Sequence, residues 1–204
     1  MTERLHADAI HVLGAWQPPT QAQSTLRDRY LAHLAAHPDG MTRDCRPDHL
    51  TASTLVLSHD RSRVLLTLHA KARRWFQFGG HCEPGDATLA AAALREATEE
   101  SGIAGLRLGP APVQLSEHAV PFCAPAGDVH HLDVRFAAVA RPDVEHEVSE
   151  ESLDVRWARR RTPGPRAGPG GARPVRAIPT TQRATGLASA RGPCRDPAAD
   201  PDLP

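Results

Sequence analysis

The sequence REATEESGI, residues 95–103, decides which fold and which chemistry we expect of this chain. Glu96, Glu99 and Glu100 stand at positions i, i+3 and i+4, so on a helix their carboxylates share one face. Like charges at this spacing repel by about 0.2–0.5 kcal/mol per pair. They also precede Gly102, near a helix C-terminus, where the helix dipole favours cations. A divalent cation with oxygen ligands removes this conflict, so the spacing predicts a site for Mg²⁺ or Mn²⁺.

A longer stretch around these residues resembles the signature of the Nudix hydrolases. That signature runs G, five residues, E, seven residues and then R-E-U-x-E-E-x-G-U, where U is aliphatic. Gly80 opens it here, and residues 95–103 match its second half, with Ala97 at an aliphatic position. The sequence departs from the signature at the first acidic position, which holds Asp86. In addition, eight residues instead of seven separate Asp86 from Arg95.

The resemblance implies both a fold and an activity. The implied fold is α/β (α+β), with a mixed β-sheet sandwiched between helices and the motif forming a loop, a helix and a loop. The implied enzyme is a Nudix-type pyrophosphohydrolase that needs Mg²⁺ or Mn²⁺ and cleaves a diphosphate linkage in a nucleoside diphosphate linked to another group. The alternative is a nucleotide or nucleotide-sugar binding module that kept the fold and lost the chemistry. The motif glutamates are intact, which favours the hydrolase.

The motif supplies the expected metal site. Spacing alone nominates the three glutamates, and a glycine allows the backbone carbonyl to approach a metal closely. The expected metal ligands are therefore Gly80, Glu96, Glu99 and Glu100. Arg95 stands four residues before Glu99 and is expected to pair with that carboxylate and hold it in place, without touching substrate. Asp86, with a shorter side chain on a longer loop, is expected to reach the metal only through water.

The general base is expected outside the motif. The resemblance implies that it is often a Glu or His from another loop over the metals, and residues 145–151 form an acidic stretch before the last expected strand. We take Glu150 as the candidate base, with Glu147 and Glu151 as its alternatives. A solvated acidic loop is the competing interpretation of this stretch.

Basic residues precede the motif on an expected loop and strand start. Arg73 and Arg74, beside Lys71, are expected to contact the substrate diphosphate, and a solvated turn is the alternative.

From the sequence alone, the histidines and cysteines indicate no second metal site. His81 and Cys82 in the motif loop could form a zinc ligand pair, but no second pair stands at a useful spacing, so we expect no zinc site. His118, His130 and His131 are expected to be ordinary core or surface histidines.

The periodicity of apolar residues predicts the order of the elements. Residues 1–49 are interpreted as a helical lead-in with a helix over 22–36, and residues 50–157 as the Nudix domain. The motif helix is expected over about 89–101 with Thr88 as its N-cap. Strands are expected at 51–58, 64–69, 75–78, 106–108, 113–117, 132–140 and 153–157.

Composition indicates which partners and which cellular location are expected. The 204 residues carry 24 basic and 24 acidic side chains, so no net charge attracts nucleic acid or a membrane. The four cysteines are scattered and the N-terminus lacks an apolar signal run, which predicts a cytoplasmic location. The expected partner is a small-molecule diphosphate, with neither nucleic acid nor membrane, and a homodimer is considered.

The last 47 residues differ from the rest of the chain. Of residues 158–204, 33 are Arg, Pro, Ala or Gly, and no apolar period survives, so the segment is expected to be disordered. We interpret it as a G+C-rich gene read out of frame, and the alternative is a native basic tail that binds anionic partners.

Overall fold

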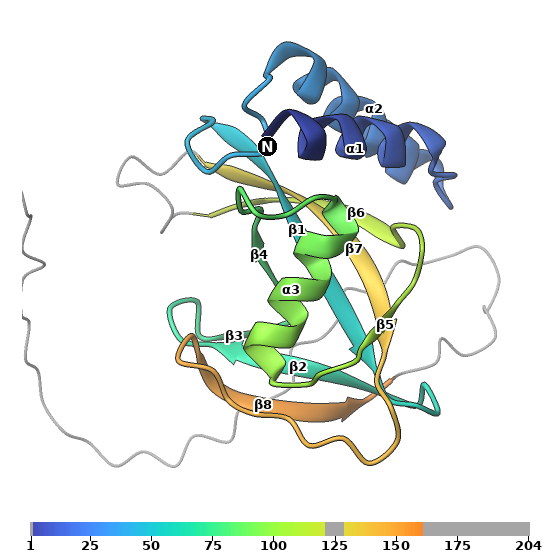
Figure 1. Ribbon diagram of the computed structural model, residues 1–204, viewed down its shortest axis with the longest axis vertical. Coiled ribbons are helices and arrows are strands. Elements are labelled where there is room, and N and C mark those ends of the chain that lie inside the picture. Colours follow the sequence, from blue (N-terminus) through green and yellow to red (C-terminus); the bar gives the residue numbers. More distant parts are fainter. Residues whose placement is uncertain (1, 121–128, 161–204) are drawn as a thin grey trace, which may run out of the picture. The chain divides into compact units, whose positions relative to one another are not determined.

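A computed structural model describes residues 2–120 and 129–160 (Figure 1). Its described part contains three helices and eight strands. The last strand runs to Arg159, two residues beyond the end expected for the domain. The rest of the segment interpreted as out of frame lies outside the described residues, as do 121–128. Among the described residues, none of the helices is both long and apolar enough to span a membrane.

Two helices precede the sheet. α1 (Thr2–Ala15) falls within the expected helical lead-in, and α2 (Gln21–Ala36) lies where the helix over 22–36 was expected. The Thr20 hydroxyl caps α2 by accepting the Gln23 N–H at 3.3 Å.

The motif helix α3 (Leu89–Ser101) begins and ends where the sequence predicts. The Thr88 hydroxyl accepts the Ala91 N–H at 3.0 Å, which satisfies one of the free donors of the first turn. At the other end Gly102 has a φ of 69°, a left-handed conformation that glycine adopts without steric cost. Both ends of α3 are therefore fixed by local sequence, which places its acidic last turn reproducibly.

The strands form one mixed sheet. β1 (Asp48–Leu57) and β7 (His130–Val139) pair in parallel over their full length, from Asp48 opposite His130 to Leu57 opposite Val139. The other pairings are antiparallel: β4 and β2 with β1, β3 and β8 with β2, and β5 and β6 with β7. The bounds of these strands are β2 (Arg63–His69), β3 (Arg74–Phe76), β4 (Phe78–His81), β5 (Arg107–Leu108), β6 (Gln114–Ala119) and β8 (Ser152–Arg159).

Small residues let α3 lie close to the sheet. Ala92 and Ala93 are fully buried against β1 and β7 in a core that also includes residues of α1 and α2. Ala97, one turn later, belongs to a second core formed with β2, β4 and β8. The Thr54 hydroxyl donates to the Ala93 carbonyl at 2.8 Å, so the helix is also tied directly to β1. Figure 1 shows α3 crossing the front of this sheet, with α1 and α2 beyond its N-terminal end.

The opposite face of β1 and β7 is polar because side chains alternate along a strand. Leu50 and Ala52 of β1 face the helices, whereas Thr51 and Ser53 hydrogen-bond to the buried carboxylate of Asp133 on β7.

The expected α/β (α+β) fold, with a mixed sheet, helices and the motif as loop–helix–loop, is confirmed. One expected strand was wrong in its extent. The strand expected over 75–78 is divided at Gln77, because Phe76 pairs with Thr67 of β2 and Phe78 pairs with Thr54 of β1. Phe76 is consequently exposed and Phe78 fully buried.

Candidate active site

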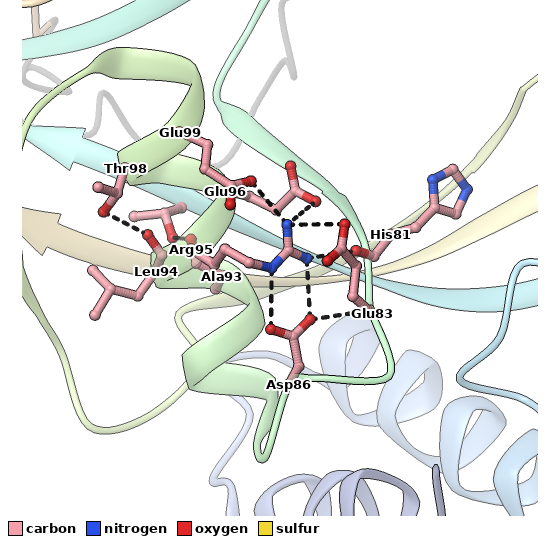
Figure 2. A network of polar contacts seen from close by, with 10 residues as sticks. His81, Glu83, Asp86, Ala93, Leu94, Arg95, Glu96, Thr98 and Glu99 are labelled. Carbon is pink, nitrogen blue, oxygen red and sulfur yellow. Dashed lines mark hydrogen bonds and ion pairs between the residues drawn. The ribbon is translucent and has the colours of Figure 1, made fainter. Parts of the chain in front are cut away.

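Arg95 is the centre of the polar network in the motif (Figure 2). Its guanidinium binds the Asp86 carboxylate through two hydrogen bonds, Nε to Oδ1 at 3.1 Å and Nη2 to Oδ2 at 3.0 Å. Nη2 also donates to the His81 carbonyl at 3.0 Å. This fork fixes the start of the motif loop against the middle of α3, because a bidentate pair constrains orientation as well as distance.

The same guanidinium reaches the motif glutamates. Nη1 donates to Glu96 Oε1 at 3.1 Å and to Glu99 Oε2 at 3.0 Å. The i,i+4 pair between Arg95 and Glu99 that the sequence suggests is therefore present. Glu99 itself is 60% exposed, so its other oxygen faces solvent rather than the core.

Asp86 is a buried partner of Arg95. Its side chain is only 6% exposed, and its Oδ2 accepts the Glu83 N–H at 2.8 Å. Burial raises the pKa of Asp86, but the hydrogen bonds from Arg95 and Glu83 lower it by more, so the net shift is downward. Both carboxylate oxygens are thus engaged within the protein. In this arrangement Asp86 holds the Arg95 guanidinium in place, and its expected contact with a metal through water stays a prediction.

The placement of Asp86 predicts the effect of Asp86→Asn. The substitution removes the charge that faces Arg95 and replaces one acceptor oxygen with a donor, so we expect a loss of about 1–3 kcal/mol in the free energy of unfolding. Hydrolysis should fall by about tenfold, as when a residue that orients a ligand is lost. Urea unfolding and steady-state kinetics check both values. Unchanged stability would contradict the pairing with Arg95.

Glu96 and Glu100 are the partly buried glutamates of the motif. Both oxygens of Glu96 lie against Gly80, where a Cβ atom would come within 2.8 Å of each. Burial raises the pKa of Glu96 to about 7, against the opposing effect of Arg95. Burial, followed by the charges of Glu96 and Glu151, raises the pKa of Glu100 to about 8, against a backbone hydrogen bond from Gly79. The C-terminal half of α3 thus holds two carboxylates that burial makes costly to ionise, and the charge of Glu96 adds to that cost at Glu100.

This donor set fits a divalent cation. Carboxylate and carbonyl oxygens are the ligands that Mg²⁺ and Mn²⁺ take, and a cation offsets both the burial and the neighbouring negative charges that raise the two pKa values. Three of the expected ligands, Gly80, Glu96 and Glu100, lie within one small region, since Gly80 touches Glu96 and Glu96 influences Glu100.

The raised pKa values predict how stability depends on pH in the metal-free protein. A carboxyl whose folded pKa exceeds its unfolded value of 4.5 binds a proton more tightly in the folded state. Glu100 therefore contributes stability at low pH that is lost as the pH rises through about 8. Relative to Glu100→Gln, the wild type should lose on the order of 1–2 kcal/mol between pH 6 and pH 8.5.

Comparing the wild type with Glu100→Gln isolates the contribution of Glu100 to the pH dependence of stability. The half-buried His81 and His131, whose pKa values burial lowers to about 4 and about 3, reduce the stability of the fold only as the pH falls below 6.5, and they do so in both the wild type and Glu100→Gln. Thermal unfolding with a chelator present, at several pH values, measures the difference. A difference that stays constant with pH would show that Glu100 ionises normally.

The acidic stretch before β8, residues 145–151, lies near the C-terminal half of α3. Glu147 lies beside Gly102, and its N–H donates to the Ser101 carbonyl at 2.8 Å. Glu151 is close enough to raise the pKa of both Glu96 and Glu100. Glu150, the candidate base, is an exposed residue of the turn between them.

Arg73 lies on the turn between β2 and β3 and Arg74 is the first residue of β3, and both side chains are exposed. Within the described residues, they are not part of the network around Arg95. The same turn is joined to the acidic stretch, because the Ala70 N–H donates to the Glu151 carbonyl at 2.9 Å.

The histidines differ most from the expectation. His81 comes together with His49 and His131, which stand far apart in the sequence. Cys82 instead packs against the core. His118 lies beside His131, whereas His130 pairs with Asp48. Spacing along the chain could not reveal this cluster, because its members come from separate strands.

Comparison with known proteins assigns the chain to a family. The family model described as NUDIX domain matches residues 47–176. The chain therefore belongs to the NUDIX family. Its class is that of a Nudix-type pyrophosphohydrolase, and members of this family generally use divalent metal ions. A search of curated proteins finds no match.

Solved structures with a similar fold include several hydrolases. A NUDIX family hydrolase from Clostridium perfringens is 24% identical, with a TM-score of 0.45 over 54% of this chain and 81% of that one. An Ap4A hydrolase from C. elegans is 17% identical, with a TM-score of 0.47 over 54% and 79%. The E. coli dihydroneopterin triphosphate pyrophosphohydrolase is 22% identical, with a TM-score of 0.45 over 55% and 80%.

Proposed function

We propose that this protein is a Mg²⁺- or Mn²⁺-dependent hydrolase that cleaves the diphosphate linkage of a nucleoside diphosphate linked to another group. The observation that carries the proposal is the pair of partly buried carboxylates, Glu96 and Glu100, which lie beside Gly80 and Gly79 and whose pKa values are raised to about 7 and about 8. Perturbed carboxylates at a glycine-lined loop are typical of a functional site. The substrate is a small molecule, and the homodimer and the cytoplasmic location stay predictions of the sequence.

The motif residues divide the work in this proposal. The cation would be held by Glu96, Glu99, Glu100 and the Gly80 carbonyl. When bound, it supplies neutralisation of phosphate charge and acidification of a water. Arg95 keeps Glu99 oriented through the 3.0 Å ion pair, and Asp86 keeps Arg95 oriented in turn. Arg95 and Asp86 are positioning residues, and neither needs to touch the substrate.

We assign the general base to Glu151 rather than Glu150. Of the three glutamates considered, Glu151 is the one whose charge acts on Glu96 and Glu100. The Ala70 N–H donates to the Glu151 carbonyl, so the backbone of Glu151 lies beside the turn that leads through Arg73 to Arg74 of β3. This proximity supports diphosphate binding by the two arginines, because a base must act near the phosphorus that the arginines hold.

The assignment predicts different effects for two adjacent substitutions. Glu151→Gln should lower kcat by about 100-fold, since a positioned general base contributes about 10²–10⁴-fold. Glu150→Gln, the matched control in the same exposed turn, should change kcat by less than about twofold, because the carboxylate that acts on Glu96 and Glu100 is that of Glu151. Steady-state kinetics at saturating Mg²⁺ give both values. The reverse order of effects would return the role to Glu150.

A substrate panel tests the function itself. The full chain is incubated with Mg²⁺ and with nucleoside diphosphate sugars, dinucleoside polyphosphates or nucleoside triphosphates in ¹⁸O-water, and the products are identified by mass spectrometry. We expect a nucleoside monophosphate and a second phosphorylated product from at least one compound, with one ¹⁸O atom incorporated at phosphorus. Saturable binding of such a compound with no product would instead identify a binding module.

A further inference from the structure

Three histidine side chains from three strands meet on the polar face of the sheet. They are His49 at the start of β1, His81 at the end of β4 and His131 near the start of β7. One ring nitrogen of each lies within 4.8 Å of the other two. His49 Nε2 and His81 Nε2 are only 3.1 Å apart, and the ring centroids are 4.9–5.1 Å apart.

Strand register brings the three rings together. His49 and His131 are direct partners in the parallel pairing of β1 with β7. His81 is the partner of Thr51, two residues further along β1, so its side chain is on the same face as that of His49. The cluster is therefore built into the central pairing of the sheet and does not depend on a flexible loop.

The geometry is close to that of a metal site. With metal–nitrogen distances of about 2.0–2.1 Å and tetrahedral angles, two imidazole nitrogens bound to one Zn²⁺ lie about 3.3 Å apart. The 3.1 Å separation of the His49 and His81 nitrogens is near this value. His131 is within reach of the same point, because its ligand atom lies within 4.8 Å of both.

The hydrogen bonding of His49 prepares it as a ligand. Its Nδ1 lies 3.2 Å from the Cys45 carbonyl oxygen, which can only accept, so Nδ1 carries the hydrogen. In the neutral ring, Nε2 then presents a lone pair to the cluster. A carbonyl that fixes the tautomer and orientation of a histidine in this way is a common feature of metal-binding histidines. His49 is also 1% exposed, which limits competition from water.

We propose that His49, His81 and His131 bind a divalent transition-metal ion, with Zn²⁺ as the preferred ion. Three imidazoles suit Zn²⁺, Co²⁺, Ni²⁺ or Cu²⁺ and do not suit Mg²⁺, which takes oxygen ligands. This site is separate from the carboxylate site in its ligand chemistry. Figure 2 shows the His81 ring pointing away from the Arg95 network, although the His81 carbonyl belongs to it. An ion held here would therefore join β1 and β7 to the start of the motif loop.

His118 is the nearest further ligand. It is the partner of His131 in the pairing of β6 with β7, and the two ring centroids are 5.7 Å apart. A change of side-chain rotamer would bring it toward the cluster as a fourth ligand; otherwise water completes the coordination.

A second group of potential ligands must be distinguished in any test. His37, Asp39 and Cys45 also have ligand atoms within 4.8 Å of one another, but His37 and Asp39 are exposed. Of the two groups, only the one with Cys45 contains a thiol. A thiolate bound to Co²⁺ gives an intense charge-transfer band, whereas imidazole does not.

The experiment titrates the chelator-treated full chain with Co²⁺ as a spectroscopic probe and with Zn²⁺ by calorimetry, in the presence of excess Mg²⁺. We expect one tight equivalent, visible d–d bands and no thiolate charge-transfer band. His49→Asn and His131→Asn should each weaken Zn²⁺ binding by at least about tenfold. His130→Asn, an adjacent histidine on the same strand that pairs with Asp48, and Cys45→Ser should leave the affinity unchanged.

Circular dichroism establishes that each variant is folded before its affinity is compared. X-ray absorption on the Zn²⁺-loaded wild type gives a readout that needs no variant, and we expect a shell of nitrogen or oxygen with the outer-shell scattering of imidazole. Wild-type affinity in both His49→Asn and His131→Asn would overturn the proposal. A sulfur ligand, or loss of binding in Cys45→Ser, would overturn it equally by assigning the ion to the other group.

Discussion

Glu100→Gln is expected to lower Mg²⁺-dependent diphosphate hydrolysis by about a thousandfold and to leave the fold intact. The substitution keeps the size of the side chain but removes an anionic ligand, and about 4 kcal/mol of transition-state stabilisation corresponds to this factor. Glu100 is partly buried, and its charge interacts with that of Glu96, which is the other expected ligand on this part of α3. Metal-free thermal stability should hold or rise, because the repulsion between the two carboxylates is lost.

Two variants serve as comparisons for this result. Glu96→Gln should be almost as inactive, since its carboxylate lies against Gly80 in the same cluster. Glu145→Gln changes an exposed glutamate of the acidic stretch by the same chemistry and should retain full activity. Initial rates over a range of Mg²⁺ concentrations give the comparison. Full activity of Glu100→Gln at an unchanged Mg²⁺ dependence would remove the argument for a metal site on α3.

Arg95→Lys is expected to have the second largest effect. A lysine keeps the charge but has no planar fork, so it cannot hold both oxygens of Asp86 while also reaching Glu99. Asp86 would remain buried with its hydrogen bonds from Arg95 lost, at a cost of about 2–4 kcal/mol in the free energy of unfolding. Hydrolysis should fall by about 100-fold through the loss of Glu99 orientation.

The control for this variant is Arg29→Lys on α2. Arg29 also forms a fork, with Glu117 and Asp48, but its side chain is 42% exposed, and exposed ion pairs contribute about 0–1 kcal/mol. The two substitutions therefore make the same chemical change in different surroundings. Denaturant unfolding and kinetics measure both. Equal effects of the two variants on stability would show that the network around Arg95 has no special importance for the fold.

The motif helix could be predicted from the sequence almost to the residue. Thr88 and Gly102 define its ends through local hydrogen bonds and backbone conformation, and these depend on few neighbours. The strands were placed to within a few residues for the same reason, because alternation is a local pattern. The division at Gln77 was missed because it depends on which strand each half pairs with, and pairing is not a local property.

The candidate site could be predicted only in part. The i,i+4 relation of Arg95 and Glu99 follows from helix geometry, so the sequence suggested it and the structure contains it. The two hydrogen bonds between Arg95 and Asp86 depend on how the loop after Gly80 folds back, which spacing does not define. The choice of Glu151 over Glu150 likewise depends on the path of the turn before β8.

The histidine cluster was missed for a further reason. His49, His81 and His131 stand on three strands, and only the parallel pairing of β1 with β7 and the antiparallel pairing of β1 with β4 bring them together. At short spacing along the chain, the pair of potential zinc ligands is His81 and Cys82. His81 is the last residue of β4, whereas Cys82 follows the strand and packs against the hydrophobic core, so only His81 belongs to the cluster.

The most direct test of the central claim is the Mg²⁺ dependence of hydrolysis by the wild-type chain. A diphosphate substrate from the panel is supplied at saturation, and product formation is followed as Mg²⁺ is added to chelator-treated protein. We predict no detectable turnover without the ion, a rate that rises and saturates with Mg²⁺, and restoration by Mn²⁺. A rate that is the same with a chelator as with saturating Mg²⁺ would contradict this claim, because Glu96 and Glu100 of α3 would then have no part in catalysis through a cation.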